Sequence, residues 1–349
     1  MGDEPAIAAN LRKAATLTAE HQVIWIAATG DEAVGRCLGE QPDLVLMHVR
    51  LGGLNAVEAT RRIMSIAPCA ILVVTSEERA NSGQVFEAMG QGAVDAIDLP
   101  SLDGGSTVES GTPLMKKIAI ISWLLLDKNR SGDAADRKAV TSAGHRCDQM
   151  VAIGASAGGP AALATLLGGL PEDFPAAIVV VQHVDAQFAI GMAQWLSRHC
   201  GLPVSVAKEG DRPVAGRVLI AGTSDHLTMK TPDTLGYTPE PRHFVYRPSI
   251  DVFFESLDQL WRGELVGVLL TGMGKDGAAG LKTLRNQGHH TIAQDAASSA
   301  VYGMPKAAAR LNAAIEILPV DRIAAALTEA LSLPSPVPRR TRTHPDTYK

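Results

Sequence analysis

Three segments of the chain each carry one residue of a type used in nucleophilic hydrolysis. Ser156 lies at the centre of a G-x-S-x-G sequence over residues 154–158, where small neighbours allow a tight turn that exposes the hydroxyl. His183 directly follows an apolar run, and Asp276 follows another apolar run after a glycine-rich stretch. Because an imidazole can take the proton of a serine while a carboxylate orients that imidazole, these residues are candidates for a Ser-His-Asp triad.

The elements expected to position these residues are strands of a parallel sheet. A helical pattern over residues 160–167 follows Ser156, and apolar runs typical of buried strands precede all three candidates. In open α/β sheets the functional site lies beyond the carboxyl ends of the strands, so the three side chains are predicted to meet at one edge. Backbone N–H groups near Ala157 and in the loop around Met273 are expected to bind an oxyanion there. The predicted strands are Met150–Ile153, Ala176–Gln182 and Leu265–Leu270.

Each of these residues also has an explanation that involves no catalysis. A glycine-rich turn between strand and helix can bind phosphate, although Ser156 occupies a position that a dinucleotide fingerprint reserves for glycine. His183 could be a hydrogen-bonded histidine at a strand end, and Asp276 could cap a helix that starts at Gly277. The chain order Ser, His, Asp differs from that of α/β-hydrolases, but it does not exclude a triad, because triads are defined by role.

Length and composition predict a two-domain protein of a reduced compartment. The chain has 349 residues, of which 46% are hydrophobic and 20% are charged, which indicates globular structure rather than disorder. The formal net charge of -5 gives no argument for nucleic acid binding or for an anionic membrane surface. The four cysteines have no CxxC spacing, and the sequence shows neither a leader nor a membrane-spanning stretch. These features favour a cytoplasmic protein with free thiols and no membrane insertion.

Four segments are predicted along the chain. Residues 1–100 alternate strand-like and helix-like patterns, which favours a doubly wound parallel α/β sheet. Residues 101–146 form a predicted Gly/Ser-rich linker with one helix over 113–126. Residues 147–333 form a second α/β domain, and the tail over residues 334–349 is predicted to be disordered. In the first domain the predicted strands are His21–Ala28, Asp43–His48, Ala70–Thr75 and Ala93–Ile97, and the predicted helices are Ala9–Thr18, Asp31–Glu40, Ala56–Ile66 and Val85–Gly90.

Five sequence blocks follow one another in the second domain: VAIGASAGGP, VVVQHV, YRPSIDVFF, LLTGMGKDGAAGL and AQDAASSAVYGMPKAA. Through these blocks the domain resembles the catalytic domain of the chemotaxis-type protein-glutamate methylesterases, the CheB family. The resemblance implies that Ser156, His183 and Asp276 hydrolyse γ-glutamyl methyl esters on methyl-accepting chemoreceptors without a cofactor, with deamidation of receptor glutamines as a harder second reaction. It places Met273 near the oxyanion site, and Ala157 stands where the family usually has threonine.

The segments HQVIWIAATGDEAV, QPDLVLMHVRLGGLNAVEATRRIM and VFEAMGQGAVDAIDLPSL lie in the first domain. They resemble a response-regulator receiver of flavodoxin-like fold, specifically that of the Wsp-type methylesterases. In this comparison His48 replaces the phosphoacceptor aspartate, Leu99 replaces the lysine near the last strand, and Thr75 keeps the switch hydroxyl. The acidic pair that helps to hold Mg²⁺ is reduced to Asp3, preceded by Gly2, and a histidine cannot form an acyl phosphate. The resemblance therefore implies a degenerate receiver that holds no metal.

The start of the first domain is unusual for a receiver. The first strand of that fold lies centrally in the order 2-1-3-4-5, yet only Met1 and Gly2 precede the presumed first loop. A central gap would leave two neighbouring strands unpaired. We therefore expect the true start to lie upstream, or part of the first strand to be missing.

The resemblance favours one function over two others. A methylesterase of a chemosensory array would act on chemoreceptors, and the histidine kinase of that array is a candidate partner. The lost phosphoacceptor and Ala157 instead suggest a non-catalytic array scaffold, and a serine esterase for small molecules is the third possibility. The three retained triad candidates argue for the methylesterase.

Overall fold

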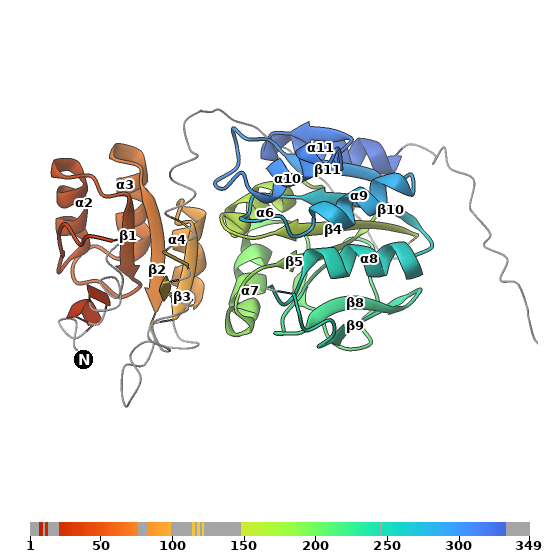
Figure 1. Ribbon diagram of the computed structural model, residues 1–349, viewed down its shortest axis with the longest axis horizontal. Helices are drawn as coiled ribbons and strands as arrows, with labels where there is room; N and C mark the ends of the chain where they lie inside the picture. The colour runs from red at the N-terminus through yellow and green to blue at the C-terminus, as the bar shows by residue number, and fades with distance from the viewer. Residues whose placement is uncertain are drawn as a thin grey trace, which may run out of the picture.

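The computed structural model of the chain describes residues 7–9, 11–12, 21–75, 82–98, 114–115, 117–118, 121, 148–244 and 246–332. Asp3, Leu99, Cys147, most of the predicted linker and the tail 334–349 lie outside these ranges, so the expectations for them remain predictions. Residues 114–115, 117–118 and 121 are helical, within the helix predicted for the linker. The described residues form two α/β units, which lie beside each other in Figure 1.

A parallel seven-stranded sheet forms the centre of the second unit. Its strands in chain order are β4 (Gln149–Ala155), β5 (Ala177–Gln182), β6 (Val204–Val206), β7 (Val218–Ile220), β10 (Glu264–Leu269), β11 (His290–Gln294) and β12 (Glu316–Leu318). In the sheet they lie in the order β12-β11-β10-β4-β5-β7-β6. Within this unit the chain first forms β4 and then adds β5, β6 and β7 on one side of it. It then crosses to β10 on the other side of β4. Open α/β sheets bind ligands at such a reversal of strand order.

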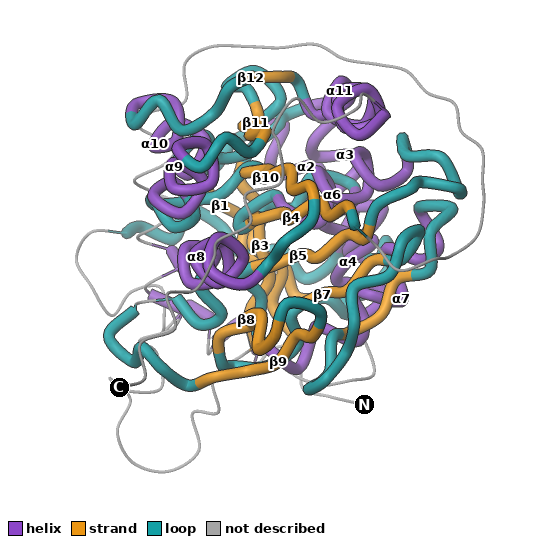
Figure 2. Tube along the Cα trace, turned by 90° about the vertical axis from the view of Figure 1, so that its right-hand side faces the viewer, coloured by secondary structure: helices purple, strands orange, loops and turns teal. Residues whose placement is uncertain are grey.

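Helices cover both faces of this sheet (Figure 2). One face carries α6 (Gly159–Gly168), α7 (Ala189–His199) and α11 (Val320–Ser332), and the other carries α8 (Ile250–Leu260), α9 (Ala278–Asn286) and α10 (Met304–Arg310). A short 3-10 helix, η1 (Ala186–Phe188), precedes α7, and an antiparallel hairpin, β8 (His226–Thr231) with β9 (Thr234–Thr238), packs beside α8. Every residue of β5 is buried, as in a strand that is covered on both faces. The predicted doubly wound fold is confirmed.

The strands predicted to lead to Ser156, His183 and Asp276 are β4, β5 and β10, with only small shifts of their ends. The helix predicted after the serine is α6, which carries Pro160 in its first turn. Proline is tolerated there because the first N–H groups of a helix have no partner within the helix. These three strands are neighbours in the order β10-β4-β5, so their carboxyl ends lie side by side.

The first unit contains a parallel sheet in the order β1-β2-β3. Its elements are β1 (Leu44–His48), β2 (Ala70–Thr75), β3 (Asp95–Asp98), α2 (Gly30–Gly39), α3 (Ala56–Ile66) and α4 (Ser82–Gly90), and all of them match predicted elements. Thr29 and Asn55 cap α2 and α3, because each side chain accepts a hydrogen bond from the backbone N–H three residues later. Residues 7–9 and 11–12 are helical and overlap the helix predicted from Ala9.

The strand predicted over His21–Ala28 is wrong. Residues 21–27 have no regular secondary structure and pair with none of the described strands. Side-chain exposure still alternates along this segment, but Ile24 and Ile26 remain 40% and 45% exposed. An alternating pattern produces a strand only where a neighbouring strand supplies the hydrogen bonds, and none of the described residues does so here.

The two units pack together through α4 of the first and through α6 and α7 of the second (Figure 1). One cluster of buried apolar side chains continues from the first unit into the second. Phe86 of α4 lies against Trp195 of α7, with ring centroids 6.2 Å apart. Gly90 allows this close approach, because a β-carbon at that position would lie 2.8 Å from Cζ2 of Trp195. Nearby, the N–H of Gly158 donates to the carbonyl of Val94 at 2.9 Å, so the first unit contacts the loop that carries Ser156.

Two sequence expectations concern membranes and thiols. Within the described ranges, no helix combines the length and the apolar composition needed to cross a bilayer. Cys37, Cys69 and Cys200 are free thiols, as expected. Burial is the main cause that raises the pKa of all three, and the pKa of Cys69 reaches about 12.

Candidate active site

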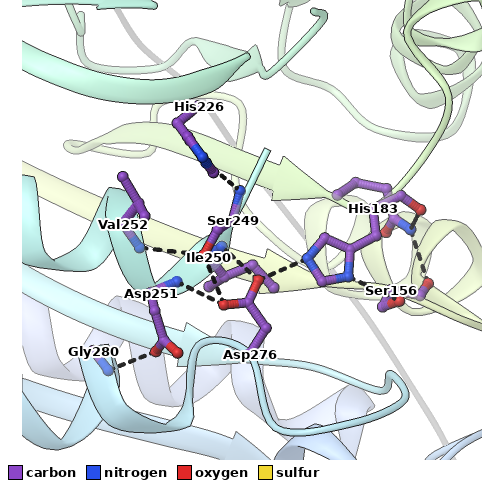
Figure 3. Close-up of polar contacts among 10 residues, drawn as sticks. Ser156, His183, His226, Ser249, Ile250, Asp251, Val252, Asp276 and Gly280 are labelled. Atoms are coloured by element: carbon purple, nitrogen blue, oxygen red, sulfur yellow. Dashed lines mark hydrogen bonds and ion pairs between the residues drawn. The ribbon is translucent and has the colours of Figure 1, made fainter. Parts of the chain in front are cut away.

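Ser156, His183 and Asp276 form a continuous hydrogen-bonded relay (Figure 3). Nδ1 of His183 lies 3.2 Å from Oγ of Ser156, and Nε2 of His183 lies 2.8 Å from Oδ2 of Asp276. Because an ionised carboxylate only accepts hydrogen bonds, Nε2 carries the ring proton and Nδ1 is left to accept from the serine hydroxyl. The side chains of His183 and Asp276 are 8% and 7% exposed, and Ser156 is buried beside them. The structure thus brings together the three residues that the strand pattern singled out.

The backbone of Ser156 is held on both sides by neighbouring strands. Its N–H donates to the carbonyl of Thr271 at 3.0 Å, and its carbonyl accepts from Nε2 of Gln182 at 2.8 Å. Thr271 follows β10, and its hydroxyl donates to the carbonyl of Ala157 at 2.9 Å. These bonds join the ends of β4, β5 and β10, so the position of Ser156 is set by the sheet.

The loop after β10 approaches the nucleophile closely. A β-carbon at Gly272 would lie 2.6 Å from Cβ of Ser156 and 2.5 Å from the sulfur of Met304, so no larger residue fits there without movement. The N–H of Gly272 donates to the carbonyl of Val301 at 3.0 Å. Gly272, which precedes the predicted oxyanion residue Met273, therefore lies against Ser156, and the role of Met273 stays a prediction.

Asp276 is fixed by the start of α8 rather than by the helix that follows it. The N-cap of α9 is Gly277, so the suggested cap by Asp276 is wrong for that helix. Its carboxylate instead accepts from the hydroxyl of Ser249 at 2.8 Å and from the N–H groups of Ile250 at 2.8 Å and Asp251 at 3.1 Å. Burial opposes the charge, but the hydrogen bonds from His183, Ile250 and Ser249 outweigh it and lower the pKa of Asp276. Asp276 therefore stays ionised and orients the imidazole.

A second carboxylate completes an exchange of caps between α8 and α9 (Figure 3). Asp251, in the first turn of α8, accepts from the N–H of Gly280 in the first turn of α9 at 2.7 Å. Asp276, just before α9, accepts from the first turn of α8. Burial and the nearby charge of Asp276 raise the pKa of Asp251 to about 7, although the Gly280 bond acts in the opposite direction. A carboxyl group at the start of each helix thus accepts N–H donors from the start of the other.

Tyr246 is a site residue that the sequence reasoning missed. Its ring stacks on the imidazole of His183, with centroids 4.3 Å apart and planes only 7° from parallel. Burial and the charge of Asp276 raise the pKa of its phenol. The YRPSIDVFF block contains this tyrosine, but no periodicity or spacing connects it with His183, so only the fold reveals the contact.

Two of the receiver positions considered in the sequence analysis, His48 and Thr75, lie at the carboxyl edge of the first sheet. His48 ends β1, Thr75 ends β2, and the two strands are paired with His48 opposite Val74. Nδ1 of His48 donates to the carbonyl of Arg50 at 2.9 Å. Thr75 is buried. An imidazole therefore occupies the strand end where the resemblance places a phosphoacceptor.

Comparisons with known proteins agree with this architecture. The CheB methylesterase profile matches residues 151–327, and the response regulator receiver domain profile matches residues 1–102. A Pseudomonas putida protein named "Protein-glutamate methylesterase/protein-glutamine glutaminase of group 3 operon" is 54% identical over 329 residues, which cover 94% of this chain and 97% of that protein. A Cupriavidus metallidurans protein named "Protein-glutamate methylesterase/protein-glutamine glutaminase 2" is 53% identical over 324 residues, with coverage of 93% and 95%. The crystal structure of the Thermotoga maritima CheB methylesterase catalytic domain matches with a TM-score of 0.50 and 33% identity, and covers 52% of this chain and 97% of that one.

The family profile spans half of the chain, and the relatives match nearly all of it. The chain therefore belongs to the CheB methylesterase family, and it joins a receiver domain to the catalytic domain. The predicted enzyme class, an ester hydrolase, is confirmed by this membership.

The stacked ring predicts different effects for two substitutions of Tyr246. Tyr246→Phe keeps the ring over His183 and is expected to retain most ester hydrolysis. Tyr246→Ala removes a stacked pair worth about 0.5–1.5 kcal/mol and exposes the imidazole, so kcat/KM is expected to fall by about 2- to 13-fold. Initial rates on one ester substrate measure both effects, and equal losses in the two variants would assign the role to the hydroxyl instead.

The raised pKa of Asp251 predicts a pH-dependent stability. The folded protein keeps this carboxyl protonated up to about pH 7, whereas the unfolded chain ionises it near 3.8. The stability that it contributes is therefore complete below about pH 4 and is lost as the pH rises through about 7. Asp251→Asn lacks this titration but keeps an oxygen that can accept from Gly280.

Thermal unfolding of both proteins at pH 5 and pH 8 tests this expectation. The melting temperature of the parent should fall relative to that of Asp251→Asn between the two pH values. A constant difference would contradict the assignment of this titration to Asp251.

Proposed function

We propose that this protein is a cytoplasmic protein-glutamate methylesterase that hydrolyses γ-glutamyl methyl esters of methyl-accepting chemoreceptors. The observation that carries the proposal is the relay from Ser156 through His183 to Asp276, with contacts of 3.2 Å and 2.8 Å. The names of the relatives supply the substrate class, since both are called protein-glutamate methylesterase/protein-glutamine glutaminase. The second half of those names supports deamidation of receptor glutamines at the same site, with the amide as the harder substrate.

In the proposed reaction, Oγ of Ser156 attacks the ester carbonyl while Nδ1 of His183 takes the hydroxyl proton. The resulting imidazolium is stabilised by the charge of Asp276. Collapse of the tetrahedral intermediate breaks the bond to the methoxy group, which leaves as methanol with the proton from His183. A water molecule, deprotonated by His183, then attacks the acyl-serine, and the products are a receptor glutamate and free Ser156.

The oxyanion of the tetrahedral intermediate must accept hydrogen bonds from N–H donors near the former carbonyl oxygen. The N–H groups of Ala157 and Met273 have no hydrogen-bond acceptor among the described residues, whereas those of Gly158 and Gly272 donate to Val94 and Val301. Ala157 directly follows the nucleophile, and Met273 follows the glycine that approaches it. These two N–H groups are therefore the proposed oxyanion donors. A backbone donor is unaffected by the replacement of threonine with Ala157.

Removal of the nucleophile tests the proposed function directly. Purified Ser156→Ala should release no detectable methanol from a methylated receptor, because removal of the serine in a comparable triad costs about 10⁶-fold in kcat. Ser205→Ala is the matched control, since Ser205 is an exposed serine on the edge strand β6, and its rate should equal that of the parent.

The outcomes separate the proposal from its two alternatives. Equal methanol release by Ser156→Ala and the parent would reject the triad. If the parent binds the receptor but does not hydrolyse its methyl esters, the alternative function of a non-catalytic array scaffold would be supported. Rapid hydrolysis of simple acetate esters without preference for a receptor would support a small-molecule esterase.

We further propose that the receiver belongs to the Wsp type and is degenerate, and that its docking on the catalytic domain lowers the rate of ester hydrolysis. The Wsp-type sequence segments and His48 at the phosphoacceptor position support the first two points. The hydrogen bond from Gly158 to Val94 and the Phe86–Trp195 contact support the third, because they join the receiver to the loop and helix beside Ser156. The array's histidine kinase remains a candidate partner for this domain.

A substitution that separates the two domains is expected to increase activity. In Gly90→Leu the new side chain would overlap the ring of Trp195, which already lies 2.8 Å from the position of a β-carbon. Methanol release is expected to rise several-fold, and Gly39→Leu serves as control because a β-carbon at Gly39 meets no atom within 4 Å. Unchanged release by a folded Gly90→Leu protein would argue against control by docking.

Acetyl phosphate provides the complementary arm of this experiment. Since His48 cannot form an acyl phosphate, this phosphodonor is expected to leave the rate of the parent unchanged. Stimulation that disappears on substitution of a receiver carboxylate would contradict the degenerate receiver.

A further inference from the structure

His226 lies wholly buried behind the triad, at the start of β8 (Figure 3). Its Nδ1 accepts from the backbone N–H of Ser249 at 3.0 Å, and its Nε2 lies 3.1 Å from the carbonyl of Pro241. A backbone N–H only donates and a carbonyl only accepts, so the ring is neutral with its proton on Nε2. Burial is the main cause that lowers the pKa of His226, which keeps this form. Both ring nitrogens are therefore used to hold backbone.

Ser249 connects this histidine to the triad. It is the N-cap of α8, and its hydroxyl donates to Oδ1 of Asp276 at 2.8 Å. The next two residues, Ile250 and Asp251, donate their N–H groups to the same carboxylate. The three donors converge on Asp276 only while the backbone at Ser249 keeps its present orientation, and His226 is the group that binds this backbone N–H.

We propose that His226 is a positioning residue for ester hydrolysis, which acts through Ser249 to fix the carboxylate of Asp276 against His183. The inference rests on the triad of the proposed function. Within the part of the chain that the structure describes, His226 forms no hydrogen bond with Ser156 or His183, so it does not take part in proton transfer. Without it, a buried N–H loses its acceptor and the start of α8 can turn away from Asp276. The imidazolium that forms during attack then loses an aligned countercharge.

A purely structural role would give a different pattern of effects. The hairpin β8–β9 also packs on α8 through buried side chains such as Leu235, and the N–H of Met229 donates to the hydroxyl of Ser256. Substitution of Leu235 should therefore loosen the same hairpin without removing the acceptor for Ser249. This residue provides a control matched for position and for loss of stability.

The test compares His226→Leu, His226→Gln and Leu235→Ala in the full chain. His226→Leu is expected to lower kcat by about 10- to 100-fold, the loss found when a residue that orients a metal-binding histidine is removed, with KM within about 2-fold. His226→Gln offers an oxygen to Ser249 and an N–H to Pro241, so it should recover most of the rate. Leu235→Ala should lower the melting temperature but leave kcat close to that of the parent.

Labelling of Ser156 by a fluorophosphonate gives a second readout that does not depend on the receptor substrate. The labelling rate should be highest in the parent, lower in His226→Gln and lowest in His226→Leu. The rate of Leu235→Ala should be close to that of the parent. Equal labelling by His226→Leu and Leu235→Ala overturns the inference, whether or not methanol is released from a receptor. If all four proteins are labelled at the parent rate and none releases methanol, both this inference and the proposed substrate are rejected. If labelling follows the expected order but no methanol is released, only the proposed substrate is rejected.

Ser249→Ala keeps the test decisive if His226→Leu does not fold. This variant retains the backbone N–H that His226 binds but removes the hydroxyl that reaches Asp276. A labelling rate lowered to the level expected for His226→Leu supports the inference that His226 acts on Asp276 through Ser249. An unchanged labelling rate overturns that inference.

Discussion

The buried charge of Asp276 is the constraint on which the rest of the site depends. A carboxylate taken out of water is costly unless hydrogen bonds replace its hydration. Here the imidazole of His183 supplies one bond, and the first turn of α8 supplies the others. The orientation of the imidazole and the packing of α8 on α9 are therefore parts of one arrangement. Movement of either helix start would disturb the relay even if no catalytic side chain changed.

The parallel sheet explains why residues so far apart in sequence converge. Ser156 and His183 follow adjacent strands, β4 and β5, and Asp276 follows β10 on the other side of β4. Ser156 therefore stands at the reversal of strand order, with His183 on one side and Asp276 on the other. The bonds of Ser156 to Thr271 and Gln182 then hold its backbone to both neighbours. Helix packing positions the carboxylate, whereas the sheet positions the serine.

Local patterns in the sequence predicted most of the elements and the three residues that the structure joins by hydrogen bonds. Apolar runs mark β4, β5 and β10, and each is followed within a few residues by one reactive side chain. The contacts of Tyr246 and His226 could not be predicted, because these residues lie outside any periodic pattern and reach the site only through the tertiary fold. The strand predicted over His21–Ala28 failed for the related reason that a strand needs a partner as well as a pattern. The bonds of Asp276 to Ser249, Ile250 and Asp251 could not be predicted either, because these residues lie 25 to 27 positions away in sequence.

The bond between the Gly158 N–H and the Val94 carbonyl joins main chain to main chain. Such a bond does not depend on which residue supplies the carbonyl oxygen, provided that the backbone just before β3 keeps its position. Side-chain substitutions in the receiver can therefore leave this attachment to the loop of Ser156 in place. The attachment of the receiver to the loop of Ser156 is thus separable from the chemistry of the receiver's own strand ends, because the two depend on different atoms.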